Sequence, residues 1–110
     1  MGKIEGNIEN LCNYSIFWPY EEKINPREVA VDLVVRLNKE KEKSYRTDLV
    51  TPAYIIKRMA KDKSTGESAN GCYFPESKPL IVEEISKDCI EKVLKDIINN
   101  GFFRLFFKTD

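Results

Sequence analysis

Few residue types in this 110-residue chain could support catalysis, because the chain has no histidine. Without imidazole, the usual base of serine and cysteine hydrolases and the commonest neutral metal ligand are excluded. Adjacent carboxylates occur at Glu21-Glu22 and at Glu83-Glu84. Neighbours on a strand point to opposite faces, so we interpret these pairs as surface charge. An enzyme that used carboxylates alone would need them to converge in a cleft, and we expect no catalytic residues.

The cysteines and glycines predict neither a metal site nor a phosphate site. Cys12, Cys72 and Cys89 are odd in number and widely spaced, which argues against a disulfide framework and against the paired spacing of a zinc site. Gly66 and Gly71 lie in a polar segment that lacks the Gly-Lys-Ser/Thr of a phosphate-binding loop. We expect three reduced thiols, no metal and no cofactor.

A small basic cluster raises the alternative of a nucleic-acid-binding or regulatory module. A solvated helix face is the simpler interpretation of these residues. The chain as a whole has 18 Lys plus Arg and 18 Asp plus Glu, for a net charge of zero, so no overall field attracts nucleic acid. The cluster consists of Lys57, Arg58, Lys61 and Lys63.

Composition predicts a single soluble domain over residues 1–110. The hydrophobic content of 42% is enough for a core. The charged content of 33% exceeds the roughly 25% of an average domain, as expected for a soluble protein. Its length fits one compact domain, since these usually have roughly 50 to 200 residues. The start of the chain has no long apolar segment, so we expect neither a signal peptide nor a membrane span. We therefore expect the protein in the cytoplasm.

Alternating apolar residues predict an antiparallel strand pair. In 28–37 the odd-numbered residues from Val29 to Leu37 are apolar, and we expect them to face the core. A helix would align Val29, Leu33 and Leu37 but would leave Val31 and Val35 on the wrong face. The alternating lysines and glutamates of 39–43 predict a solvated loop, and 45–50 the return strand. Residues 14–20 read as an extended segment, whereas 1–13 carry little pattern.

Two helices are predicted by their start signals and apolar stripes. Thr51 and Pro52 indicate a strand-to-helix junction, with Thr51 as the N-cap of a helix over 52–62. Ser86 caps a second helix with a strong apolar stripe, which Gly101 ends. We expect a loop over 63–70 and short strands over 71–74, 80–84 and 102–108. The fold class is therefore α+β, a mostly antiparallel sheet of four to six strands with two main α-helices packed on it.

The order of these features matches a known pattern. Trp18-Pro19 precedes the long alternating strand and the charged loop, the return strand runs into Val50-Thr51-Pro52-Ala53-Tyr54-Ile55, and Leu80-Ile81-Val82-Glu83 precedes an amphipathic helix. Over roughly residues 16–98 this order resembles the immunity protein 8 family of bacterial polymorphic toxin systems. The chain departs from the family in having Tyr54 in place of a tryptophan, a loop rich in lysine and glutamate, and a short tail rich in phenylalanine.

The resemblance implies a non-enzymatic inhibitor that binds one cognate toxin domain in the cytoplasm, as in contact-dependent growth inhibition. Many such toxins are nucleases with basic clefts, so acidic groups with aromatic anchors are the natural contacts. We expect no membrane and no direct nucleic-acid contact. The candidates for the toxin interface are Tyr20, Glu21, Glu22, Asp32, Tyr73, Glu76, Glu83 and Glu84.

Overall fold

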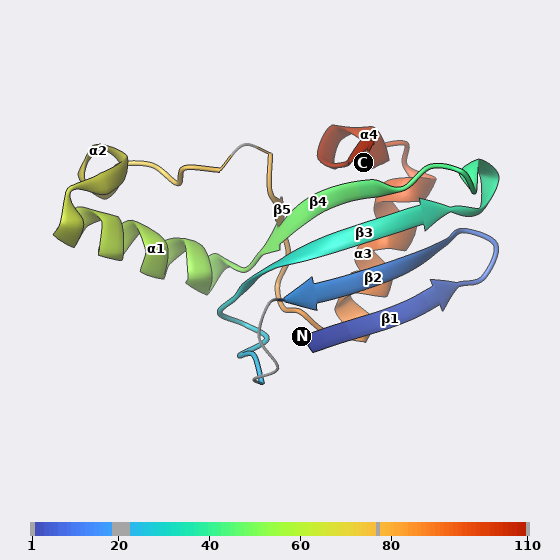
Figure 1. The fold of residues 1–110 in the computed structure, drawn as a ribbon, viewed down its shortest axis with the longest axis horizontal. Coiled ribbons are helices and arrows are strands. Elements are labelled where there is room, and N and C mark those ends of the chain that lie inside the picture. The colour runs from blue at the N-terminus through green and yellow to red at the C-terminus, as the bar shows by residue number, and fades with distance from the viewer. Residues whose placement is uncertain (1, 19–22, 77, 110) are drawn as a thin grey trace.

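A six-stranded sheet forms the body of the protein (Figure 1). The computed structural model describes residues 2–18, 23–76 and 78–109. The strands lie in the order β1-β2-β3-β4-β5, and β6 also pairs with β4. All pairings are antiparallel except that of β5 with β4. The strands are β1 (Gly2–Ile8), β2 (Cys12–Trp18), β3 (Ala30–Leu37), β4 (Tyr45–Val50), β5 (Leu80–Ile81) and β6 (Lys108–Thr109).

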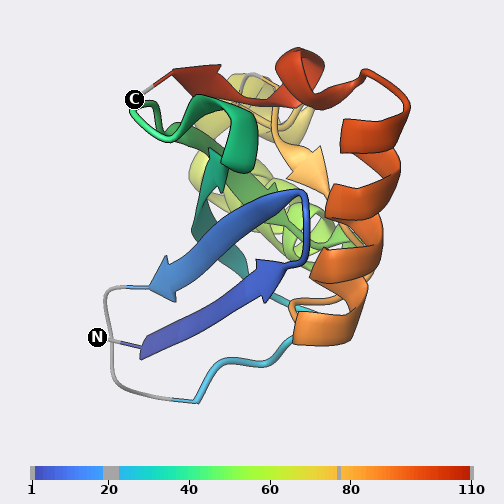
Figure 2. The ribbon, with the colours of Figure 1, turned by 90° about the vertical axis from the view of Figure 1, so that its right-hand side faces the viewer.

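The two main helices occupy different places, and the predicted α+β class with its mostly antiparallel sheet is confirmed. Helix α3 (Lys87–Asn99) crosses one face of the sheet (Figure 2). Helix α1 (Pro52–Thr65) continues from the end of β4 and extends beyond the sheet, with α2 (Glu67–Gly71) at its far end (Figure 1). We expected both helices to pack on the sheet, but only α3 does. The predicted apolar stripe of α1 stays partly in solvent, and Ile56 is 70% exposed.

The core fills the space between the sheet and α3. The odd-numbered residues Val31, Leu33 and Val35 of β3 are buried, as the alternation predicts, and their counterparts Tyr45 and Leu49 lie on the same face of β4. Burial of these side chains from water supplies the main stabilisation of the fold. They meet a stripe of buried residues on α3, which is Ile90, Leu94 and Ile97.

Strand β1 is not predicted from the sequence, and its glycines explain why. A Cβ on Gly2 would lie 1.9 Å from the Trp18 ring, and a Cβ on Gly6 would lie 2.4 Å from the Tyr14 hydroxyl. These aromatic side chains from β2 lie over β1, so its inner face carries two glycines where an apolar repeat would be expected. The Tyr14 hydroxyl also donates a hydrogen bond to Glu91 Oε2 at 2.6 Å, which ties β2 to α3.

Thr51 has a different role from the predicted one. It occupies the N-cap position with Pro52 following, but its hydroxyl makes no capping hydrogen bond. The Thr51 Oγ1 atom instead accepts a hydrogen bond from Val29 N at 3.1 Å and donates one to Val29 O at 3.4 Å. This side chain is fully buried, so it joins the end of β4 to the start of β3. The predicted cap of α3 is confirmed, because Ser86 Oγ accepts from Cys89 N at 3.2 Å.

Three segments differ from the predicted elements. The loop expected over 63–70 is mostly the end of α1 and α2, and no strand forms over 71–74. Only Leu80–Ile81 of the segment 80–84 is a strand. The phenylalanine-rich tail forms the short helix α4 (Phe103–Phe106) before β6. Phe103 and Phe107 are buried, and their rings stack with centroids 4.2 Å apart. The tail therefore covers part of the core with a short helix where a strand was predicted.

Candidate functional site

The face of the sheet opposite α3 presents polar side chains in rows. Because side chains alternate between faces, the even-numbered residues of β3 and β4 point away from the core. Asp32 of β3 lies directly opposite Asp48 of β4, and Phe17 of β2 is the other neighbour of Asp32. Two carboxylates in register on one face are unfavourable neighbours. Because this pair does not help to stabilise the sheet, it is the part of the outer face that most calls for a functional explanation.

A third carboxylate reaches the same place from a distant part of the chain. Glu76 lies in the segment that returns from α2 toward β5, and it lines a hollow of about 140 Å³ together with Asp32 and Asp48. We call these three residues and the space between them the acidic hollow. The remaining lining comes from Phe17, Ala30 and Val31.

The electrostatics of the acidic hollow disfavour its ionised form. Burial raises the pKa of Asp32, and the hydrogen bond and negative charge of Asp48 raise it further, against the opposing charge of Arg46. Burial also raises the pKa of Glu76, with a contribution from Asp48 and an opposing one from Arg58. Glu76 Oε2 is buried and has no hydrogen-bond partner among the described residues. A cation entering the hollow would favour the ionised form of both groups.

The outer face also carries an aromatic and a cation beside the hollow. The Arg46 guanidinium lies over the Phe17 ring, 5.5 Å from its centroid. Phe17 therefore provides an apolar wall next to the carboxylates, and the Arg46 guanidinium lies against this ring. A partner side chain with an aliphatic stem and a charged end would match this combination.

The structure brings together only some of the predicted interface residues. Asp32 and Glu76 meet in the acidic hollow, whereas Tyr73 is 54% exposed and does not line it. Glu83 and Glu84 lie near the same arginine, with Arg27 Nη2 at 3.8 and 3.9 Å from their carboxylate oxygens. The candidates Tyr20, Glu21 and Glu22 lie outside the described residues.

Asp48 is the residue of the site that sequence reasoning missed. The predicted return strand places it on the solvent face, and the register of the hairpin places it opposite Asp32. That register was the available signal, since residues on the same face pair across a hairpin whose loop is known. Glu76 could be proposed from its charge, but nothing local in the sequence indicates that it joins the other two.

The predicted basic cluster is partly neutralised within the chain. Lys57 Nζ lies 2.7 Å from Glu28 Oε1, and Arg58 Nε lies 3.1 Å from Asp62 Oδ1. These ion pairs leave Lys61 and Lys63 as the members without such a contact in the described part of the chain. Two lysines give a weak electrostatic footprint for nucleic acid.

The cysteines and helices give no further site. Cys12 is buried, and burial raises the pKa of its thiol to about 11. Cys12, Cys72 and Cys89 are all free thiols. The described residues contain no cluster of His, Cys, Asp or Glu that could hold a metal ion. Among the described helices, none has the length and apolarity needed to cross a membrane.

Comparisons of the chain with protein-family models, with curated proteins and with solved structures found no match.

Proposed function

We propose that this protein is an immunity protein that binds and neutralises the toxin domain of a bacterial polymorphic toxin system, in the cytoplasm and without catalysis. The observation that carries the proposal is the acidic hollow. It holds three carboxylates on an open sheet face, two of which have a raised pKa, and one buried oxygen, Glu76 Oε2, has no partner among the described residues. A cationic side chain of a partner would relieve this repulsion.

The size of the hollow favours a partner side chain over a substrate. Small-molecule sites usually enclose roughly 300 to 1,000 Å³, whereas this hollow has about 140 Å³. One lysine or arginine side chain fits such a space, and a metabolite with room to react does not. Nuclease toxins with basic clefts would present that kind of side chain, which links the acidic hollow to the resemblance noted in the sequence.

The alternative of a nucleic-acid-binding module has less support. Two of its four basic residues, Lys57 and Arg58, are engaged by Glu28 and Asp62, and carboxylates on the outer face would repel phosphates. Binding to RNA or DNA at low salt, weakening steeply as salt is added, would favour this alternative instead.

The proposal predicts that a large secreted protein with a toxic C-terminal domain is encoded beside this chain, and it is tested by the affinity for that domain. Asp32→Asn and Glu76→Gln keep the shape of each side chain and remove its charge. We expect each to weaken binding by about 1 to 2 kcal/mol, less than the 2 to 5 kcal/mol of a fully buried charge pair, because the hollow is open on one side. Glu42→Gln, which changes an exposed glutamate of the loop between β3 and β4, is the matched control for charge and should bind like the unmodified protein. Equal affinity of all these variants would exclude the acidic hollow as the interface.

A further inference from the structure

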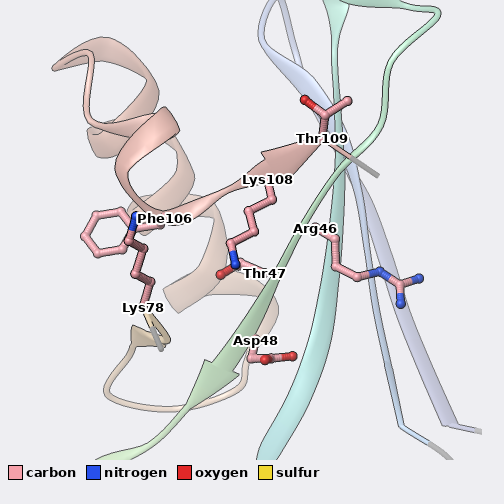
Figure 3. A pocket seen from close by; sticks show the side chains of 7 residues that line it. All are labelled: Arg46, Thr47, Asp48, Lys78, Phe106, Lys108 and Thr109. Atoms are coloured by element: carbon pink, nitrogen blue, oxygen red, sulfur yellow. The ribbon is translucent and has the colours of Figure 1, made fainter. Parts of the chain in front are cut away.

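The two edges of the sheet are protected to different degrees. At the β4 edge the outermost strands, β5 and β6, have only two residues each, and β6 lies beside β4 at Lys108 and Thr109 (Figure 3). Short edge strands are one way in which proteins avoid pairing with other chains. At the opposite edge, β1 has seven residues and no proline, and it pairs only with β2 in the described part of the chain (Figure 1). Strand β1 is therefore the long open edge of the sheet.

The hydrogen-bond pattern shows which residues of β1 face this open edge. Asn38 N donates to Leu11 O at 2.9 Å, so Leu11 and every second residue after it along β2 bond to β3. The residues between them direct their N–H and C=O groups at β1, and their partners there are the even-numbered residues of β1. The N–H and C=O groups of Lys3 and Glu5 therefore point away from the sheet, with no strand beside them among the described residues.

The residues of β1 are self-complementary in one antiparallel register. If Ile4 lies opposite Ile4 of a second copy, Lys3 of each chain lies opposite Glu5 of the other, and each such pair exchanges two backbone hydrogen bonds. The Lys3 and Glu5 side chains are exposed on the same face and form an ion pair within one chain. A shift by one residue would set outward-facing groups against groups already bonded to β2. A shift by two would place Glu5 opposite Glu5 or Lys3 opposite Lys3, and like charges directly opposite destabilise a sheet.

We propose that β1 pairs with β1 of a second copy of this chain, with Ile4 at the two-fold axis, so that two sheets join into one. Ile4 is partly buried against the core, and it would meet its copy at a non-hydrogen-bonded position, where opposite side chains are closest. One strand pairing is small beside a standard interface of roughly 1,600 Å², so we expect a weak dimer that forms at high protein concentration. The acidic hollow lies across β2, β3 and β4 and stays open, so this pairing does not depend on the proposed function.

Sedimentation velocity over a dilution series tests the pairing. Lys3→Glu and Glu5→Lys each convert both ion pairs of the dimer into repulsion, and we expect each to weaken dimerisation by about five- to twenty-fold. The double variant Lys3→Glu/Glu5→Lys restores opposite charges in the proposed register, so it should dimerise like the unmodified protein. Lys41→Glu and Glu42→Lys make the same charge changes at exposed positions of the loop between β3 and β4 and should have no effect.

A mixture of the two single variants separates the contact between chains from the ion pair within one chain. The Lys3→Glu chain carries two glutamates and the Glu5→Lys chain two lysines, so they should pair with each other more strongly than either pairs with itself. Mixing cannot repair a repulsion within one chain. A mixture of the two control variants should behave like the unmodified protein.

Hydrogen exchange identifies the strand that pairs. As the protein concentration rises, the backbone amides of Lys3 and Glu5 should exchange with D₂O more slowly, whereas those of Ile4 and Gly6 should be protected at every concentration. The proposal is overturned if the unmodified protein stays monomeric up to a concentration of about 1 mM, or if the double variant dimerises as weakly as the single ones. A dimer that neither single variant weakens uses another surface and also overturns it.

Discussion

At the scale of single residues, Thr51 shows how one hydroxyl connects two strands. Its Oγ1 atom is the partner of Val29 N at 3.1 Å, inside a fully buried environment. Thr51→Val keeps the shape and leaves that N–H without its partner, so we expect a loss of about 1 to 3 kcal/mol in the free energy of unfolding. Urea denaturation measures it, and an unchanged midpoint would show that the hydroxyl does not matter there.

The acidic hollow predicts a gain in stability when its charges are removed. A raised pKa means that Asp32 and Glu76 bind protons more tightly in the folded state than in the unfolded chain. Stability is therefore lost as pH rises from the ordinary values of 3.8 and 4.5 through the raised ones. The Asp32→Asn and Glu76→Gln variants should melt at a higher temperature than the unmodified protein at pH 7.

The gain should disappear at about pH 2.5, well below the ordinary pKa values of 3.8 and 4.5, where the carboxyls are protonated in both the folded and the unfolded state. Thermal melts followed by circular dichroism at the two pH values measure it, with Glu42→Gln as the control. A lower melting temperature of the two variants at pH 7 would mean that the carboxylates stabilise the fold, and the acidic hollow would then be a structural feature.

At the scale of elements, β1 depends on glycine beneath an aromatic ring. Gly6→Ala would bring a methyl group to 2.4 Å from the buried Tyr14 side chain, and we expect destabilisation of about 1 to 3 kcal/mol from overpacking. Gly101→Ala is a useful comparison, because nothing lies within 4 Å of its Cβ and only the positive φ of 75° opposes it. A smaller loss for Gly6→Ala than for Gly101→Ala, by urea denaturation, would contradict the packing of β2 over β1.

The two main helices should differ in local stability. Helix α3 is anchored by three buried apolar residues, whereas the only buried residue of α1 is Asp62. Few buried apolar contacts allow local opening at low free energy. We expect the backbone amides in the middle of α1 to exchange with D₂O faster than those of α3. Equal protection of the two helices would mean that α1 is held by contacts other than those described.

Periodicity predicted the elements in which one pattern dominates. The alternation from Val29 to Leu37 identifies β3 and its buried face, and Ser86 identifies the start of α3. Periodicity could not predict β1, because Gly2 and Gly6 interrupt its apolar repeat and leave room for the Trp18 and Tyr14 rings of β2. Periodicity also could not place Glu76 beside Asp32, because their proximity depends on how the chain returns from α2.

At the scale of the whole molecule, the chain is elongated. Its radius of gyration is 14.8 Å and its extents are 46 × 29 × 21 Å, whereas a compact domain of this length is expected to have a radius of about 13 Å. The extra length comes from α1 and α2 beyond the sheet (Figure 1). The return from this extension carries Glu76 to the acidic hollow. The acidic hollow therefore depends on the segment that connects α2 to β5.

The most direct test of the central claim is growth of cells that express the neighbouring toxic domain together with this protein. We predict that the unmodified protein and Glu42→Gln restore growth, and that the double variant Asp32→Asn/Glu76→Gln does not, although it is folded and present at the same level. Full protection by the double variant would contradict the acidic hollow as the site of neutralisation. Growth arrest in the presence of the unmodified protein would contradict the proposed function itself.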